Sequence, residues 1–150
     1  METDHQYQPL LTIGAVAKTL QVSEQMVRLY EESGLVLPER TGSNRRMYSL
    51  HDLERLQCIR TFIDEHGMTL NGIRRLLSFL PCWEYQGGLD ADCEQCAAYY
   101  SMAGPCWSQE PVGPKCAEQN CRDCEVYRLP VNCDTLKSII FQRDPFTRRE

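Results

Sequence analysis

Eight of the nine cysteines lie within 52 residues of the second half of the chain. They form two successive quartets of similar spacing, Cys-x10-Cys-x2-Cys-x9-Cys and Cys-x4-Cys-x2-Cys-x8-Cys. Eight thiolates are the number that two four-sulfur metal sites require. We therefore predict metal ligands at Cys82, Cys93, Cys96, Cys106, Cys116, Cys121, Cys124 and Cys133.

The segment around these cysteines has little apolar surface with which to build a core. Residues 81–133 lack a long apolar stripe and contain five prolines and four glycines. A bound metal supplies cohesion to such a segment, because metal binding and folding are then one event. The composition predicts a small, irregular module that binds a metal or a cluster at residues 81–135, rather than a set of unrelated buried cysteines.

The spacing leaves the kind of metal open. Zinc sites usually pair two Cys-x2-Cys knuckles, whereas each quartet here contains one. Iron–sulfur clusters accept less regular spacing, and Cys116-x4-Cys121-x2-Cys124 resembles the plant-ferredoxin pattern with a shorter final gap. We favour iron–sulfur clusters, with structural zinc as the alternative and soft-metal or thiol sensing as a third. Grouping the cysteines into quartets by sequence order is an assumption. The ligands of the two sites can also interleave along the chain.

The length and composition of the chain also indicate the cellular compartment in which it is expected. The 150 residues have room for one modest domain and a small module, and no apolar run approaches a membrane span. The first residues carry no export signal, so we expect a cytoplasmic protein that has no membrane partner and keeps its thiols reduced. Reduced thiols favour metal ligation over a disulfide scaffold.

The net charge of −5 argues against a nucleic-acid partner, but its distribution is uneven. Residues 1–80 carry nine basic and ten acidic groups, and residues 81–150 carry seven and eleven. Arg28, Arg40, Arg45 and Arg46 lie close in sequence, so a local basic face is possible in the first half.

The first half has the pattern of a helix-turn-helix. Thr12 precedes a helix with an apolar face, and Ser23 precedes a second helix that extends to about Ser33. Gly34 stands where a left-handed helix stop is expected. Two short helices joined by a tight turn place the second one in a DNA major groove. Met26, Val27 and Tyr30 form its apolar side, leaving Glu24, Gln25 and Arg28 for the exposed side.

The elements that follow complete a winged domain. Residues 40–48 are rich in Gly, Ser, Asn and Arg, which indicates a hairpin whose arginines contact phosphates. A third helix is expected from about Leu50 to His66, with Leu53, Leu56, Ile59 and Ile63 buried. Thr69 caps a fourth helix, and Pro81 ends the helical pattern. Cys58, on the third helix, is expected to be structural.

The stretch from Leu11 to Leu80 resembles the DNA-binding domain of the MerR family. The segments that carry the resemblance are Thr12-Ile13-Gly14-Ala15-Val16-Ala17, Val22-Ser23, Arg28-Leu29-Tyr30-Glu31, Gly34-Leu35-Val36, Arg46-Met47-Tyr48-Ser49, Asp52-Leu53-Glu54-Arg55-Leu56 and Gly67-Met68-Thr69-Leu70-Asn71-Gly72-Ile73. Arg28-Leu29-Tyr30-Glu31, Pro38 and Arg40-Thr41 are most similar to the heat-shock-repressor branch.

The resemblance implies a homodimer on palindromic promoter DNA, with RNA polymerase as a further partner. It places Arg28 and Tyr30 on the recognition helix, and Arg46 and Tyr48 in the wing. With the helix caps and the neighbouring polar residues, the predicted DNA-binding set is Thr12, Ser23, Gln25, Arg28, Tyr30, Arg45, Arg46 and Tyr48. Met26 departs from the family, where a threonine is common.

A second departure follows Leu80. Family members usually continue into a long dimerisation helix, but Pro81 and Gly87-Gly88 interrupt it here, since proline inside a helix costs about 3 kcal/mol. We expect a mainly α chain: a flexible leader at 1–10, the winged helix-turn-helix domain at 11–80, the cysteine module at 81–135, and a short helix with a tail at 136–150. A regulator is favoured over an enzyme; a thiol oxidoreductase using Cys-x2-Cys is a remote alternative.

Overall fold

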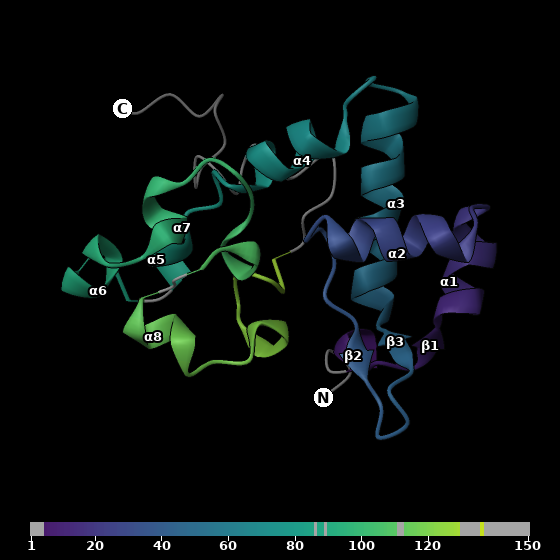
Figure 1. Cartoon of the computed structure of the whole chain (residues 1–150), viewed down its shortest axis with the longest axis horizontal. Helices are drawn as coiled ribbons and strands as arrows, with labels where there is room; N and C mark the ends of the chain where they lie inside the picture. Colours follow the sequence, from purple (N-terminus) through teal and green to yellow (C-terminus); the bar gives the residue numbers. More distant parts are fainter. Residues whose placement is uncertain (1–4, 86, 89, 111–112, 130–135, 137–150) are drawn as a thin grey trace, which may run out of the picture. The chain divides into compact units, whose positions relative to one another are not determined.

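The computed structural model is mainly α-helical with one small sheet (Figure 1) and divides into two compact units, residues 1–73 and 74–150. It describes residues 5–85, 87–88, 90–110, 113–129 and 136. The division falls inside a helix, α4, so residues 74–80 continue the first-half pattern but pack with the second unit. In the described part of the chain, the helices are too short or too polar to span a bilayer.

The first two helices begin where the sequence predicts. α1 spans Ile13–Leu20, and the side-chain oxygen of Thr12 accepts the Ala15 N–H at 3.2 Å. α2 spans Glu24–Glu32, and the side-chain oxygen of Ser23 accepts the Met26 N–H at 3.1 Å. Each cap satisfies a backbone donor that has no partner within its helix. Gln21, between the helices, is left-handed with φ 57°, which makes the turn tight.

Gly34 ends the second helix as predicted. Its φ of 74° lies in the left-handed region, where an L side chain is strained. The Leu35 N–H then donates to the Tyr30 carbonyl at 3.0 Å, which closes the helix end. This turn directs Leu35 and Val36 into the core, where both are fully buried.

A three-stranded antiparallel sheet contains the predicted wing. β2 (Glu39–Arg40) and β3 (Arg46–Tyr48) form its hairpin, and in the turn the Thr41 N–H donates to the Arg45 carbonyl at 3.0 Å. β1 (Leu11–Thr12) pairs with the other side of β3, giving the order β1-β3-β2. The two residues of β1 are too few for an alternating pattern, so the sequence did not indicate this strand.

The third and fourth helices match their predicted positions. α3 spans Leu50–Asp64 and begins with a capping box between Ser49 and Asp52. α4 spans Leu70–Leu77, with the Thr69 hydroxyl accepting the Gly72 N–H at 3.0 Å.

The buried side of α3 differs from the predicted stripe. Leu56 and Ile59 are buried as expected, whereas Leu53 and Ile63 are only half-buried. Phe62 and Cys58 take the remaining buried positions. The buried side of α3 also includes the polar residues His51, Asp52 and Arg55, so it is offset from the predicted apolar stripe.

The leader contains local structure next to the first core. His5–Tyr7 form a 3-10 helix, labelled η1, and the Tyr7 ring lies 5.2 Å from the His51 ring between centroids. His51, at the start of α3, is buried rather than on the surface. The expectation of a flexible leader therefore does not describe residues 5–7.

The core of the first unit consists of apolar and aromatic side chains from helices and sheet. Its fully buried members are Val16, Val27, Tyr30, Leu35, Val36, Tyr48 and Leu56. α1, α2, α3 and β3 all contribute, so the hairpin and the helix-turn-helix share one core. Such a core holds the exposed side of α2 in a defined position relative to the wing.

The second unit is built from single helical turns. After Leu80, no helix among the described residues exceeds four residues, so the long helix typical of the resemblance is absent from this part of the chain. The elements are α5 (Cys82–Tyr85), α6 (Ala91–Glu94), α7 (Ala97–Tyr100), η2 (Cys106–Ser108), α8 (Pro114–Ala117) and η3 (Cys121–Asp123). The helix predicted at 136–150 lies outside the described residues except for Leu136, which is buried.

Candidate functional site

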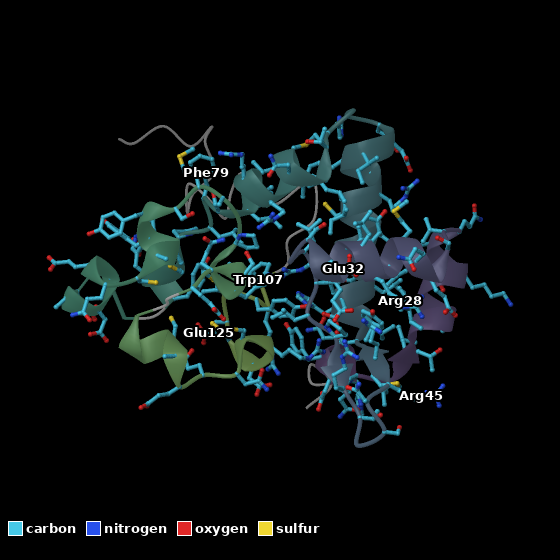
Figure 2. All side chains as sticks on the ribbon, viewed as in Figure 1. Arg28, Glu32, Arg45, Phe79, Trp107 and Glu125 are labelled. Atoms are coloured by element: carbon cyan, nitrogen blue, oxygen red, sulfur yellow. The ribbon has the colours of Figure 1, made fainter. Side chains whose placement is uncertain are left out.

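One side of α2 faces solvent with polar side chains. Glu24 and Gln25 are exposed, and Arg28 retains 36% of its side-chain exposure, while Val27 on the opposite side is fully buried. Figure 2 labels Arg28 on α2 and Arg45 in the hairpin, both in the first unit. The predicted division of this helix into an apolar and a polar side is confirmed for these four residues.

Two tyrosines predicted to contact DNA belong to the core instead. Tyr30 and Tyr48 are both 0% exposed. The Tyr30 hydroxyl accepts a hydrogen bond from Arg60 Nη1 at 3.3 Å, and this bond raises the pKa of Arg60. Burial raises the pKa of Tyr48 to about 12. A side chain without exposed surface cannot reach a phosphate or a base, so both are removed from the DNA-binding set.

Glu31 links the recognition helix to the wing. Its carboxylate accepts a hydrogen bond from Arg40 at 3.2 Å and another from Arg46 Nε. The hydrogen bond from Arg46 raises the pKa of that arginine. Glu31 is not among the predicted DNA-binding residues, although it ends the Arg28-Leu29-Tyr30-Glu31 segment. Its role becomes visible only where the hairpin returns to α2.

The arginines of this unit differ in how readily they can meet a phosphate. Arg45 is exposed at the hairpin turn and makes no ion pair within the described part of the chain. Arg28 pairs with Glu24 at 3.4 Å, one helical turn away. Exposed ion pairs contribute about 0–1 kcal/mol to the stability of a fold. A DNA phosphate can therefore replace Glu24 as the partner of Arg28 at a small cost in free energy.

Thr12 and Ser23 act first as helix caps. Both side-chain oxygens are occupied by backbone N–H donors, as described for α1 and α2. Each hydroxyl still has its own proton to donate. Of the predicted set, Ser23, Gln25 and Arg45 are exposed, and Thr12, Arg28 and Arg46 are half-buried.

Six of the predicted metal ligands line one pocket in the second unit. Trp107 and Tyr127 contribute aromatic walls to it. Its cysteines are Cys82, Cys96, Cys106, Cys116, Cys121 and Cys124. The tertiary structure therefore brings together thiols from α5 to η3, across most of the module. Cys133, the eighth predicted ligand, lies outside the described residues.

A second pocket adjoins the first and shares three of its cysteines. Cys93 joins Cys82, Cys96 and Cys116 there, with Trp83 and Tyr99 beside them. All seven described cysteines of the module thus line one pocket or the other. Cys58 is buried on α3 in the first unit and lines neither, in line with its expected structural place.

Burial and mutual proximity disfavour the thiolate forms in the absence of a cation. Burial, then the thiols of Cys116, Cys96 and Cys93, raise the pKa of Cys82 to about 11. Burial also raises the pKa of Cys106, Cys116 and Cys121, and neighbouring thiols add to each shift. A soft cation reverses this preference, because it binds the thiolate and displaces the proton.

The thiols share pockets without forming a closed coordination shell. Among the described residues, no three His, Cys, Asp or Glu side chains converge closely enough to hold a metal ion. No disulfide joins the described cysteines. The donor chemistry therefore suits a soft metal, while ligation would require the surrounding short turns to draw inward.

Each tryptophan that follows a cysteine contacts a tyrosine. Trp83 meets Tyr99 edge-on at 5.7 Å between ring centroids, and Trp107 meets Tyr127 edge-on at 5.1 Å. Such contacts between aromatic rings stabilise a fold by about 0.5–1.5 kcal/mol in addition to the effect of burying their apolar surface. Ordinary packing thus explains both tryptophans, and the same rings also form apolar walls of the cysteine pockets.

Comparison with known proteins covers mainly the first half of the chain. Residues 11–80 match the model of the MerR HTH family regulatory protein, which ends before the clustered cysteines. The HTH-type transcriptional regulator GlnR of Bacillus cereus is 39% identical over 77 residues, 51% of this chain and 59% of that protein. The mercuric resistance operon regulatory protein of Bacillus cereus is 37% identical over 91 residues, 60% of this chain and 61% of that protein.

A heat-shock relative is also similar, as the motifs suggested. HspR of Streptomyces coelicolor, a heat shock protein by name, is 33% identical over 69 residues, 46% of each chain. This identity is below that of GlnR, so the comparisons support the family without selecting the heat-shock branch. The match covers less than two thirds of each of these relatives.

Proposed function

Residues 11–80 match the model of the MerR HTH family, and from this match we propose that the chain is a sequence-specific, promoter-binding transcription regulator of the MerR type. The observation that carries the proposal is the exposed polar side of α2 next to the β2–β3 hairpin on one rigid core. Related proteins are named as transcription regulators, which supports the same class of activity.

In this proposal, α2 enters the major groove and the wing contacts the backbone. Gln25 and Arg28 are placed to contact base edges or phosphates, and Arg45 to contact phosphate at the hairpin turn. Glu31 holds Arg40 and Arg46 against α2, which fixes the wing relative to the helix. The acidic net charge makes affinity depend on these few contacts rather than on long-range attraction.

We further propose that the cysteine module senses redox state or metal through iron–sulfur clusters. Six thiols around one apolar, aromatic-walled pocket support this proposal. A bound cluster would supply one-electron redox chemistry, and burial beside Trp107 and Tyr127 would exclude water from it. Structural zinc is the alternative occupant; it would staple the module for dimerisation or protein contacts and would not respond to redox state.

The proposed regulator works as a homodimer at a palindromic site, with RNA polymerase at the same promoter. Because the described residues after Leu80 contain only single helical turns, the cysteine module itself is the proposed dimer element. A change at the thiols then alters how two DNA-binding units are held. The DNA responds if the two states differ in affinity or in the bend they impose.

Anaerobic purification followed by absorption spectroscopy and elemental analysis tests the sensor. Brown protein with absorption near 400 nm and stoichiometric iron and sulfide supports clusters, whereas colourless protein with zinc supports the structural alternative. Protein without metal rejects both. Selection from a random duplex library tests DNA binding separately, with loss of enrichment in Arg28→Ala as its internal control.

A further inference from the structure

We propose that Cys116, and not Cys106, completes the metal site of Cys82, Cys93 and Cys96. Cys106 then belongs with Cys121 and Cys124, so the ligands of the two sites interleave along the chain. This inference rests on the proposed cysteine-bound cofactor and deepens it by assigning which thiols share one metal. It replaces the sequence-order quartets, in which Cys106 joins the first set and Cys116 the second.

The smaller pocket contains one complete set of four thiols. Cys82, Cys93, Cys96 and Cys116 line it, and no other described cysteine does. Four cysteine sulfurs are the number that a tetrahedral site for a soft divalent ion or one cluster requires, and these four must move inward to close the shell. Cys106 lines only the larger pocket, where Cys121 and Cys124 also lie.

A glycine allows Cys116 to reach this set. A Cβ at Gly113 would lie 2.6 Å from the Asp92 carbonyl oxygen and 3.4 Å from Cys96 Cβ. The first distance is shorter than any real contact, so only glycine permits this approach. α8 begins directly after Gly113, and the Cys116 N–H donates to the Gly113 carbonyl at 3.0 Å. The turn that carries Cys116 is thereby packed against the segment of Cys93 and Cys96.

An internal repeat pairs each outlying cysteine with its own Cys-x2-Cys. Pro81-Cys82-Trp83 and Pro105-Cys106-Trp107 are followed by Cys93-x2-Cys96-x2-Tyr99 and Cys121-x2-Cys124-x2-Tyr127. In both copies the tryptophan meets the tyrosine edge-on, with interplanar angles of 74° and 84°. The first contact ties Cys82 to the Cys93–Cys96 turn, and the second ties Cys106 to the Cys121–Cys124 turn.

The sequence-order assignment has one structural argument in its favour. Cys106 lines the larger pocket together with Cys82 and Cys96, and η2 lies close to α7. However, Cys93 does not line that pocket, so the set Cys82, Cys93, Cys96 and Cys106 has no common cavity. The interleaved set has one, and both the glycine contact and the repeat agree with it.

Paired cysteine variants of the full chain distinguish the two assignments. The reduced apoprotein is titrated with Co²⁺ without oxygen, and bound cobalt is counted by elemental analysis and by sulfur-to-cobalt absorption. Two double variants are compared, Cys93→Ser/Cys116→Ser and Cys93→Ser/Cys106→Ser. Interleaving predicts that Cys93→Ser/Cys116→Ser loses one of the two equivalents of bound cobalt. It predicts that Cys93→Ser/Cys106→Ser loses both. Cys58→Ser, outside both pockets, is the matched control and keeps full capacity.

Each result decides between the assignments. The reverse pattern, in which Cys93→Ser/Cys106→Ser retains an equivalent, overturns interleaving while leaving a metal-binding module. Loss of all cobalt from both variants also overturns it, because the two sets would not be separate. Wild-type protein that binds no Co²⁺ overturns the cofactor proposal together with this one.

A second measurement uses the wild-type chain and so does not depend on the folding of a variant. The thiols are alkylated after addition of one equivalent of Co²⁺, and the modified cysteines are identified by mass spectrometry. Interleaving predicts that Cys116 is protected to the same extent as Cys93 and Cys96, and that Cys106 follows Cys121 and Cys124. Protection of Cys106 together with Cys93, without Cys116, contradicts the proposal.

Discussion

The two units of this chain achieve compactness by different means. The first buries a contiguous set of apolar side chains, with Val27, Leu35 and Leu56 fully inaccessible, beneath helices of eight to fifteen residues. The second has single helical turns, and thiols line its pockets. Apolar burial stabilises a fold by about 25 cal/mol per Å² of buried area, and among the described residues most of the fully buried apolar side chains lie in the first unit.

This difference assigns different tasks to the units. A core that folds without a ligand keeps α2 and the wing in a fixed arrangement, which reading a DNA sequence requires. A unit whose cohesion depends on a ligand changes its structure when the ligand changes. The proposed function thus combines an invariant DNA-binding surface with a responsive module, and each prediction below tests one side of that contrast.

The largest expected effect is on the second unit, after metal removal. A strong thiol-competing chelator, added without oxygen, should abolish amide protection across residues 82–129, because the proposed metal would couple binding to folding there. Protection in α1, α2 and α3 should be retained. Hydrogen exchange read by mass spectrometry measures both, with restored Zn²⁺ as the control. Equal loss in both units would contradict the contrast.

Next in size is a cavity in the first core. Leu56→Ala should lower the free energy of unfolding of the first unit by about 2–5 kcal/mol, since Leu56 is fully buried. Urea denaturation followed by helix circular dichroism measures it. Leu29→Ala, at a residue 40% exposed on α2, should change stability by less than about 0.5 kcal/mol. Loss of metal capacity in Leu56→Ala would show that the units do not fold independently.

A smaller effect is expected in the wing. Arg45→Ala should weaken binding to every DNA sequence alike, because Arg45 is proposed to contact phosphate. The slope of the logarithm of the binding constant against the logarithm of the salt concentration should fall in magnitude by about 1 per subunit. Fluorescence anisotropy at several salt concentrations measures this. Arg45→Lys, which keeps the charge, should preserve the slope. A change in sequence preference would instead assign Arg45 to a base contact.

The smallest effect separates the two buried tyrosines. The Tyr48 hydroxyl is buried without a hydrogen-bond partner in the described part of the chain, so Tyr48→Phe should leave stability unchanged or raise it by up to about 1 kcal/mol. Tyr30→Phe removes the bond from Arg60 and should cost about 1 kcal/mol. Urea denaturation measures both. Weaker DNA binding in Tyr48→Phe, with stability unchanged, would restore Tyr48 to the DNA-binding surface.

Local chemistry made the helices and the hairpin predictable. The caps at Thr12, Ser23 and Thr69 depend on side chains three residues from the N–H groups they bind, and the stop at Gly34 depends on the lack of a side chain. β1 and the offset of the buried side of α3 were not predictable in this way. Both depend on partners far along the chain, namely β3 for the strand and the surrounding core for the helix.

The sequence by itself determined the helix-turn-helix domain at residues 11–80, which matches the MerR model, and the thiol density of the second half. Both follow from residue identity and spacing, which set capping, helical periodicity and donor chemistry. Only the tertiary structure decided that Tyr48 is a core residue, that Glu31 joins α2 to the wing, and that Cys116 shares a pocket with Cys93. Burial and long-range contact depend on how segments distant in sequence pack, and spacing along the chain carries no record of that packing.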